Sequence, residues 1–257
     1  MERVKTGIHG LDEMLSGGFL PETANLVEGA PGTGKTTLGM QFIYNGATQF
    51  DQPGLILTFE EFPRQYYRDA LSFGWDFKAL EAQNKLRVVM TSPEVTKLDL
   101  QRVNGQVERM AAEIGAQRIL IDSLSHFERM TTDPIELRGL VFEFINALKR
   151  LNFTCVLTRE NPALLGEPGD VEDSGLAFVV DSYILLRYVE IESAVHKALL
   201  VLKLRGSNHD KEIREFTIGP DGMEVKTRFE DQEGIFTGTP RRRMRDAFAQ
   251  AFPGANK

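Results

Sequence analysis

The amino-acid sequence predicts an α/β fold: a mainly parallel central sheet flanked by helices in three layers, with antiparallel strands added toward the C-terminus. Between residues 24 and 158, short apolar runs alternate with segments of helical periodicity, which is the pattern of parallel α/β proteins. From Val179 onward the helical periodicity gives way to closely spaced strand-like runs, as in antiparallel hairpins. At 257 residues the chain is long enough for one such domain with a large core.

Three parts are expected along the chain. Residues 1–23 are a lead-in segment, in which apolar residues at helical spacing and a double glycine predict a short helix within 5–23. Residues 24–228 are the main domain. Residues 229–257 are a tail that Arg241, Arg242, Arg243 and Arg245 make basic. Those arginines fit either a solvated helix face or a contact with a partner or nucleic acid.

A glycine-dense turn joins the first apolar run to the first long helical segment. Residues 29–36 read Gly-Ala-Pro-Gly-Thr-Gly-Lys-Thr and satisfy the pattern G-x-x-x-x-G-K-[ST]. Its glycines let backbone N–H groups converge on an anion, and the helix that follows aims its N-terminus at the same place. The alternative is a chance glycine-rich turn, but the strand-turn-helix context is the one that phosphate binding requires.

The turn therefore predicts a site for a nucleoside triphosphate and Mg²⁺. Lys35 would bridge the β- and γ-phosphates, the Thr36 hydroxyl would ligate Mg²⁺, and Thr37 would reach the α-phosphate. The predicted nucleotide-binding residues of the turn are Gly29, Pro31, Gly32, Thr33, Gly34, Lys35, Thr36 and Thr37.

Later elements follow the same alternation. Continuous apolar runs, typical of strands covered on both faces, lie at 55–59, 86–90, 118–122 and 153–158. Helices are predicted at 36–49, 64–72, 98–114 (interrupted at Gly105) and 134–151. Antiparallel strands are predicted at 183–189, 197–204, 216–218 and 223–225.

Two adjacent carboxylates, Glu60 and Glu61, follow the run 55–59. They would lie at the carboxyl edge of the sheet, where ligands bind in open α/β proteins. We expect their strand to neighbour the strand that precedes the glycine turn, so that one of them orients or deprotonates an attacking water. A solvated acidic turn before Pro63 is the alternative. With Lys35, the two glutamates form the predicted catalytic set.

The run 118–122 ends in Asp122, as expected of an acid that holds a water of the Mg²⁺ shell, so Thr36 and Asp122 are the predicted metal residues. Polar residues also close the run 153–158. Thr158 fits either a sensor of the γ-phosphate or a capping and turn role. The sensor candidates are Ser123, Thr158 and Glu160, and the acidic stretch 161–173 that follows predicts a loop.

Lys203 and Arg205 share one face of a predicted strand by the two-residue period. Two cations on one face fit a phosphate clamp, or an exposed basic edge strand that discourages pairing.

Bulk properties restrict the functional class. A formal net charge of −7 argues against a broad non-specific grip on nucleic acid. No apolar run reaches the roughly 18 residues of a membrane span, and the N-terminus lacks the apolar core of a signal peptide. The single cysteine, Cys155, lies in an apolar run and is predicted to be a buried hydrophobe. The cytosol is therefore the expected compartment.

Taken together, these motifs resemble the KaiC-like branch of the RecA-type ATPases over nearly all of residues 3–228. The segments that carry the resemblance are 6–12, 29–36, 41–46, 58–61, 72–76, 121–123, 203–206 and His209.

The resemblance implies a RecA-like fold assembled as a homo-oligomeric ring, commonly a hexamer, with ATP or ADP and Mg²⁺ held between subunits. Glu60 and Glu61 match catalytic carboxylates, Asp122 matches the acid of the Mg²⁺ site, and Ser72 matches a nucleotide contact. The contacts to the nucleotide of the adjacent subunit are matched by Lys203, Leu204, Arg205, Ser207 and His209. Lys203 and Arg205 would then act in trans as cationic fingers.

Three functions are consistent with the sequence. The first is a cytoplasmic ATP hydrolase whose turnover switches the shape or partner affinity of a ring. The second is an ATP-dependent scaffold with little hydrolysis, acting on a protein partner in signalling or motility. The third is a recombinase-like DNA-dependent ATPase, which the acidic balance and the acidic 161–173 stretch disfavour.

Overall fold

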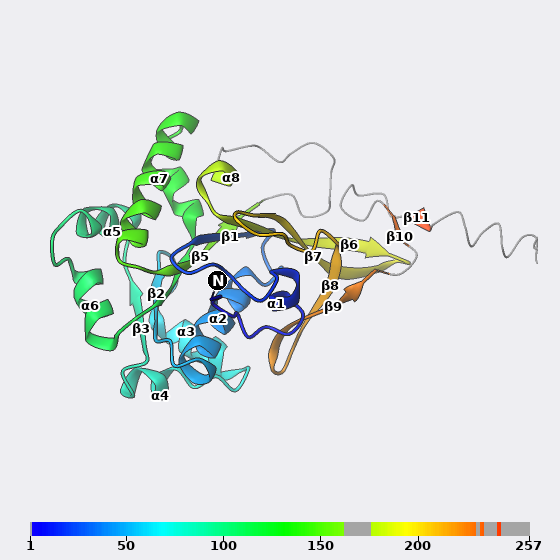
Figure 1. Ribbon diagram of the computed structural model, residues 1–257, viewed down its shortest axis with the longest axis horizontal. Coiled ribbons are helices and arrows are strands. Elements are labelled where there is room, and N and C mark those ends of the chain that lie inside the picture. The colour runs from blue at the N-terminus through cyan, green and yellow to red at the C-terminus, as the bar shows by residue number, and fades with distance from the viewer. Residues whose placement is uncertain (1, 162–175, 230–231, 234–240, 243–257) are drawn as a thin grey trace, which may run out of the picture.

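A nine-stranded sheet forms the centre of the computed structural model, which describes residues 2–161, 176–229, 232–233 and 241–242. The strand order is β3-β2-β4-β5-β1-β6-β7-β8-β9 (Figure 1). The strands from β3 to β6 in this order run parallel, and β7, β8 and β9 are antiparallel. The bounds are β1 Ala24–Gly29, β2 Gly54–Thr58, β3 Leu86–Met90, β4 Arg118–Asp122, β5 Thr154–Glu160, β6 Ser182–Ile191, β7 Ala194–Leu204, β8 Arg214–Gly219 and β9 Gly222–Arg228. The predicted mixed sheet is confirmed, and a short ladder pairs β10 Gln232–Glu233 with β11 Arg241–Arg242.

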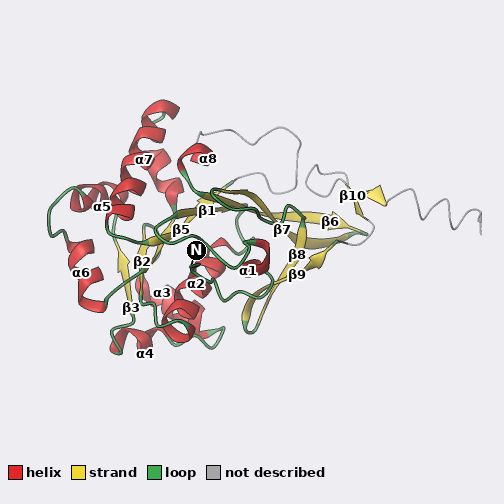
Figure 2. Ribbon diagram, viewed as in Figure 1, coloured by secondary structure: helices red, strands yellow, loops and turns green. Residues whose placement is uncertain are grey.

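Helices cover both faces of the sheet (Figure 2). One face carries α1 Leu11–Met14, α2 Lys35–Gln49, α3 Pro63–Leu71 and α4 Phe77–Ala82. The other carries α5 Pro93–Leu100, α6 Gln106–Ile114, the 3₁₀ helix η1 Leu124–Arg129, α7 Pro134–Arg150 and α8 Leu176–Val179. None of the described helices is both long and apolar enough to cross a bilayer.

Alternate residues of each parallel strand enter the two cores. Leu26 of β1 packs with α5–α8, and its neighbour Val27 packs with α1–α4. In β2, Leu57 likewise packs with α5–α8, and Ile56 packs with α1–α4. Because both faces are covered, these strands read as continuous apolar runs. Cys155 of β5 is fully buried, as predicted.

The lead-in helix is much shorter than expected. Only the single turn α1 is helical, although the apolar residues around it are buried. Gly7, Gly10 and the pair at 17–18 have positive φ, a conformation that an α-helix does not contain. Val4 instead forms a bridge with Phe19, which folds the segment back on itself.

The expected helix over 98–114 is two helices, α5 and α6, separated by a five-residue loop at 101–105. Asp99 explains the break, since its carboxylate accepts the N–H groups of Gln106 (2.7 Å) and Val107 (2.8 Å) at the start of α6. A side chain at Gly105 would meet the Asp99 carbonyl at 2.4 Å. Of the predicted loop 161–173 only residue 161 lies within the described residues, and positions 243 and 245 of the tail lie outside them.

The expected neighbourhood of β1 and β2 is wrong. β4 and β5 stand between them, because α2 crosses the face of β5 and β4 on the way from β1 to β2. The carboxyl ends still meet at one edge, since the register places Gly29 opposite Glu160 and Thr58 opposite Asp122. Glu60 and Glu61 therefore reach the same edge as the glycine turn from three strands away.

Arg118, at the start of β4, is fully buried and joins three parts of the chain. Its guanidinium donates to the Phe42 carbonyl (2.8 Å), the Lys5 carbonyl (2.9 Å) and the Gln52 side chain (2.9 Å). It also lies 4.4 Å from the centre of the Phe42 ring. Burial lowers the pKa of Arg118 to about 10. The lead-in segment, α2 and the sheet are thus tied together by one side chain.

We expect Arg118→Met to lower the free energy of unfolding by about 3 kcal/mol, because the carbonyls of Lys5 and Phe42 and the Gln52 amide oxygen each lose a donor. Urea unfolding followed by circular dichroism measures the change. Arg109→Met on the exposed face of α6 is the matched control and should leave the midpoint almost unchanged. Equal midpoints for the two variants would show that the buried guanidinium contributes no net stability.

Candidate active site

The glycine turn between β1 and α2 is built so that its backbone, rather than side chains, faces outward. Gly32 and Gly34 have φ of 76° and 111°, which favour glycine. A Cβ at Gly34 would lie 2.5 Å from Ile218, and one at Gly32 would lie 2.8 Å from Tyr188. The buried Thr33 folds its hydroxyl back onto the Ala30 carbonyl at 2.8 Å. The turn therefore has the form of a cradle that receives an anion on its N–H groups.

Lys35 begins α2 and is 7% exposed. Its ammonium donates to the Ala30 carbonyl at 3.0 Å, within the cradle. Burial lowers the pKa of Lys35, and the carboxylates of Glu160, Asp122 and Glu28 oppose that shift. The ammonium is thus held at the floor of the cradle, among acidic groups.

A cavity of about 370 Å³ opens above the cradle. It brings together residues that follow or end β1, β2, β4 and β5. The predicted residues that line it are Pro31, Gly32, Gly34, Lys35, Thr36, Thr37, Glu60, Glu61, Asp122, Ser123 and Glu160. Three lining residues were not predicted: Thr58, Tyr66 and Ile218.

Thr36 and Asp122 meet at the cavity wall. The Thr36 hydroxyl donates to Asp122 Oδ2 at 2.9 Å, which uses its proton and leaves its oxygen lone pairs available. Thr158 donates to Asp122 Oδ1 from behind, so this fully buried residue supports the carboxylate rather than facing the cavity. An alcohol oxygen beside a carboxylate is a hard-oxygen donor set that fits Mg²⁺. Among the described residues no group of three or more His, Cys, Asp and Glu side chains is arranged to hold a metal.

Glu60 and Glu61 differ in environment. The Glu60 side chain is 69% exposed and lies 3.6 Å from Nε2 of His126. Burial raises the pKa of Glu61, as do the charges of Asp69, Asp122 and Glu60. The Thr58 hydroxyl accepts the N–H of Glu61 at 3.1 Å and so shapes the turn that carries both carboxylates.

The residues that the sequence did not indicate belong to no motif, and of the three only Thr58 has a positional signal. Thr58 is the polar residue that ends an apolar strand, and its hydroxyl organises the turn after it. Tyr66 lies on the first helix after the two glutamates, and its hydroxyl donates to Asp122 Oδ2. Ile218 belongs to β8, which is distant in sequence and reaches the cradle only through the order of the antiparallel strands.

Comparisons with known proteins identify the family of the chain. Residues 4–230 match the family model described as "ATPase: KaiC". The chain belongs to the KaiC ATPase family. It is 36% identical over 238 residues to the circadian clock protein KaiC3 of Synechocystis, covering 93% of this chain and 46% of that protein. It is also 36% identical over 242 residues to the circadian clock oscillator protein KaiC of Synechococcus elongatus, covering 93% of this chain and 45% of that protein. The chain therefore spans about half the length of the curated relatives it matches.

The fold of this KaiC-family chain also matches a solved structure. A KaiC-like protein of the hyperthermophilic archaeon Pyrococcus horikoshii superposes with a TM-score of 0.77 at 32% identity, covering 88% of this chain and 99% of that one. The RecA-like fold inferred from the sequence is thereby confirmed.

The segment predicted to reach a neighbouring subunit lies away from the cavity of its own chain. Lys203 is opposite Tyr183, which is opposite Leu26, three residues before the end of β1. The segment thus lies toward the amino ends of the parallel strands, whereas the cavity lies at their carboxyl ends. None of Lys203, Leu204, Arg205, Ser207 and His209 lines the cavity.

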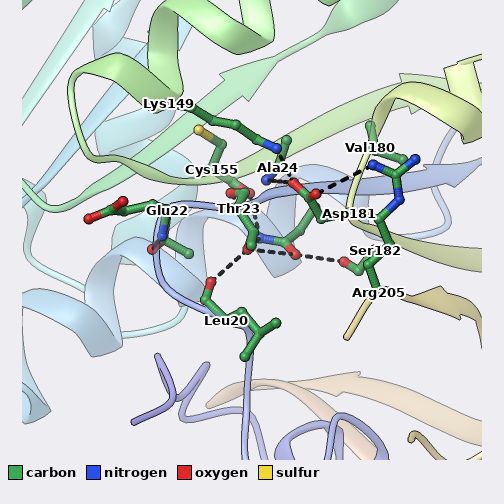
Figure 3. A network of polar contacts seen from close by, with 12 residues as sticks. Leu20, Glu22, Thr23, Ala24, Lys149, Cys155, Val180, Asp181, Ser182 and Arg205 are labelled. Carbon is green, nitrogen blue, oxygen red and sulfur yellow. Dashed lines mark hydrogen bonds and ion pairs between the residues drawn. The ribbon is translucent and has the colours of Figure 1, made fainter. Parts of the chain in front are cut away.

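In this KaiC-family chain the two cations of that segment bind the end of α8. Lys203 donates to the carbonyls of Ala177 (2.6 Å) and Val180 (2.7 Å), and Arg205 donates to that of Phe178. Arg205 also lies 3.8 Å from Asp181, which pairs with Lys149 as well (Figure 3). The phosphate clamp and the basic edge strand both remain possible roles for this pair. β7 pairs with β8 only at positions 198–199, so it is a local sheet edge near Lys203.

The remaining predicted contacts are placed as follows. Leu204 is buried, and Ser207 accepts a hydrogen bond from Arg3. The ring nitrogens of His209 are buried and have no hydrogen-bond partner in the described part of the chain. Ser72 closes α3, where its hydroxyl donates to the Asp69 carbonyl at 2.6 Å, and it does not line the cavity. Its role as a nucleotide contact stays a prediction.

Proposed function

We propose that this chain binds ATP with Mg²⁺ in the cavity and hydrolyses it within a ring of identical subunits. The observation that carries the proposal is that one cavity contains the cradle with Lys35, the Thr36–Asp122 pair and both glutamates. Each part supplies one requirement of phosphoryl transfer to water: an anion site, a metal site and a base.

The reaction assigns a role to each group. The cradle N–H groups and Lys35 neutralise the phosphates, and one glutamate accepts a proton from a water whose oxygen bonds to the γ-phosphorus as the bond to the β-phosphate oxygen breaks. Glu61 is the proposed base, because burial and the neighbouring carboxylates raise its pKa, whereas the Glu60 side chain is largely exposed. The products are ADP and inorganic phosphate.

Thr36 and Asp122 would hold the metal, with Asp122 reaching it through a bound water. When bound, Mg²⁺ supplies positive charge at the β- and γ-phosphate oxygens. Ser123 and Glu160, which line the same wall, remain sensor candidates, whereas Thr158 acts through Asp122.

The charge of the cavity supports completion by a second subunit. Its lining contains one lysine against four carboxylates, those of Glu60, Glu61, Asp122 and Glu160. A triphosphate adds about four further negative charges, so cations beyond Lys35 and Mg²⁺ are needed for tight binding. Lys203 and Arg205 lie at the other end of the strands and would supply that charge to a neighbour in a head-to-tail ring. Six subunits are the number that the family resemblance implies.

Phosphate release by the full chain tests the proposal directly. With ATP and Mg²⁺ we expect steady release of phosphate, and with excess EDTA none. Light scattering in ATP should give a ring mass that falls toward the protomer mass without nucleotide. Assembly without phosphate release would support an ATP-dependent scaffold instead, and a rise in turnover with single-stranded DNA at low salt would support a recombinase-like enzyme.

A regulatory role follows if the ring changes its partner with nucleotide state. Capture of bound proteins by the chain in ATP and in ADP should then yield different partners, whereas the same partners in both states would argue against a switch.

A further inference from the structure

Tyr66 reaches the cavity although no motif contains it. It lies on α3, is 2% exposed, and its ring packs in the core between that helix and the sheet. Its hydroxyl nevertheless lines the cavity and donates to Asp122 Oδ2. A buried aromatic ring thus delivers one polar atom to the predicted metal site.

Three hydroxyl groups converge on the Asp122 carboxylate. Thr158 donates to Oδ1, and Thr36 and Tyr66 both donate to Oδ2. An ionised carboxylate has about four acceptor positions, so about one is left for a donor that enters from the cavity. A water bound to Mg²⁺ is the donor expected there.

The three hydroxyls are not equivalent. Thr36 is also the predicted metal ligand, and Thr158 donates only to the opposite oxygen, Oδ1. Tyr66 is therefore the donor to Oδ2 that has no other predicted role in the site. A phenol is an ordinary hydrogen-bond donor at neutral pH.

The same hydrogen bond joins two parts of the site. α3 begins at Pro63, two residues after Glu61, so the helix carries the glutamate turn at its start. Through Tyr66 this helix is attached to the end of β4, where Asp122 lies. Base and metal carboxylate are therefore held at a fixed separation.

We propose that Tyr66 is a positioning residue of the Mg²⁺-nucleotide site, whose hydroxyl orients the Asp122 carboxylate toward the water shell of the metal. This rests on the proposed function, since it requires a Mg²⁺-nucleotide at this site. Removal of such outer partners typically changes metal affinity about 10- to 100-fold. Because two other hydroxyls remain on Asp122, we expect about a tenfold effect.

The test compares Tyr66→Phe with Tyr67→Phe in the full chain. Each variant loses one phenol oxygen, but Tyr67 donates to Glu81 (2.6 Å) and does not line the cavity. Binding of a fluorescent ADP analogue is titrated with MgCl₂ and repeated in EDTA. Tyr66→Phe should need about tenfold more Mg²⁺ for half-maximal metal-dependent binding, with binding in EDTA unchanged, and Tyr67→Phe should match the wild type.

A double variant separates positioning from a general structural effect. In an Asp122→Asn background, Tyr66→Phe should have no further effect on the Mg²⁺ requirement. The same tenfold effect in that background, an unchanged requirement in Tyr66→Phe alone, or a Tyr66→Phe chain that does not fold would each overturn the proposal. Absence of Mg²⁺-dependent binding in the wild type would instead overturn the proposed function.

Discussion

Replacement of both Glu60 and Glu61 by glutamine should reduce phosphate release by about 10²- to 10⁴-fold, the range of a lost general base. Glutamine keeps the size of the side chains but cannot accept the proton of the attacking water. ATP binding should persist, because the cradle and the Thr36–Asp122 pair are untouched. Phosphate release and binding of a fluorescent ATP analogue, measured on the same preparation, check both halves of this expectation.

The single variants identify the base. Glu61→Gln should account for most of the loss, and Glu60→Gln for less, since Glu60 is largely exposed. Glu113→Gln on exposed α6 is the control and should leave turnover unchanged. A larger loss of phosphate release in Glu60→Gln than in Glu61→Gln would assign the base to Glu60.

The pH dependence of kcat/KM tests the direction of the Glu61 pKa shift independently of the variants. A raised pKa means that Glu61 becomes protonated, and inactive as a base, at a higher pH than an ordinary glutamate. On acidification, turnover should therefore begin to fall above the usual range for glutamate.

Replacement of Lys203 and Arg205 by alanine should lower turnover by about 10³-fold or more, the effect of a lost cationic finger. Among the described residues that line the cavity, Lys35 is the only cation, against the carboxylates of Glu60, Glu61, Asp122 and Glu160. The loss of two further positive charges would therefore leave the transferring phosphoryl group poorly neutralised. Because both residues also bind the end of α8, a thermal melt must accompany the assay.

Mixing two inactive variants tests whether those cations act between subunits. The double glutamine variant retains Lys203 and Arg205, and the double alanine variant retains both glutamates. In a ring mixed from equal amounts, half of the subunits carry both glutamates and half carry Lys203 and Arg205. About a quarter of the sites would therefore combine intact glutamates with intact cations from the neighbouring subunit. Recovery of activity on mixing is expected, and a mixture as inactive as its components would exclude action in trans.

Local chemistry made much of the site predictable. The cradle is specified by four residues whose backbone and charge requirements are fixed by phosphate binding, and Asp122 is an acid at the end of a buried strand. The alternation of strand and helix gave the layers, because strands covered on both faces must be apolar throughout. The family resemblance gave the fold, which the comparisons confirm.

Features that depend on long-range packing were not predictable. The order of the strands is fixed by how α2 crosses the sheet, which a list of local patterns does not contain. Tyr66 reaches Asp122 across 56 positions of sequence, and Arg118 reaches Lys5 across 113. A lone tyrosine or arginine in a sequence gives no sign of such a partner.

The contact between Gly34 and Ile218 links the phosphate turn to the antiparallel end of the sheet. A methyl group at position 34 would meet the Ile218 side chain of β8 at 2.5 Å even in the absence of any nucleotide. Glycine at this position therefore serves the packing of β8 against the turn as well as the shape of the cradle. A loss of affinity in a Gly34→Ala chain would accordingly report disturbed packing at Ile218 together with obstruction of the ligand.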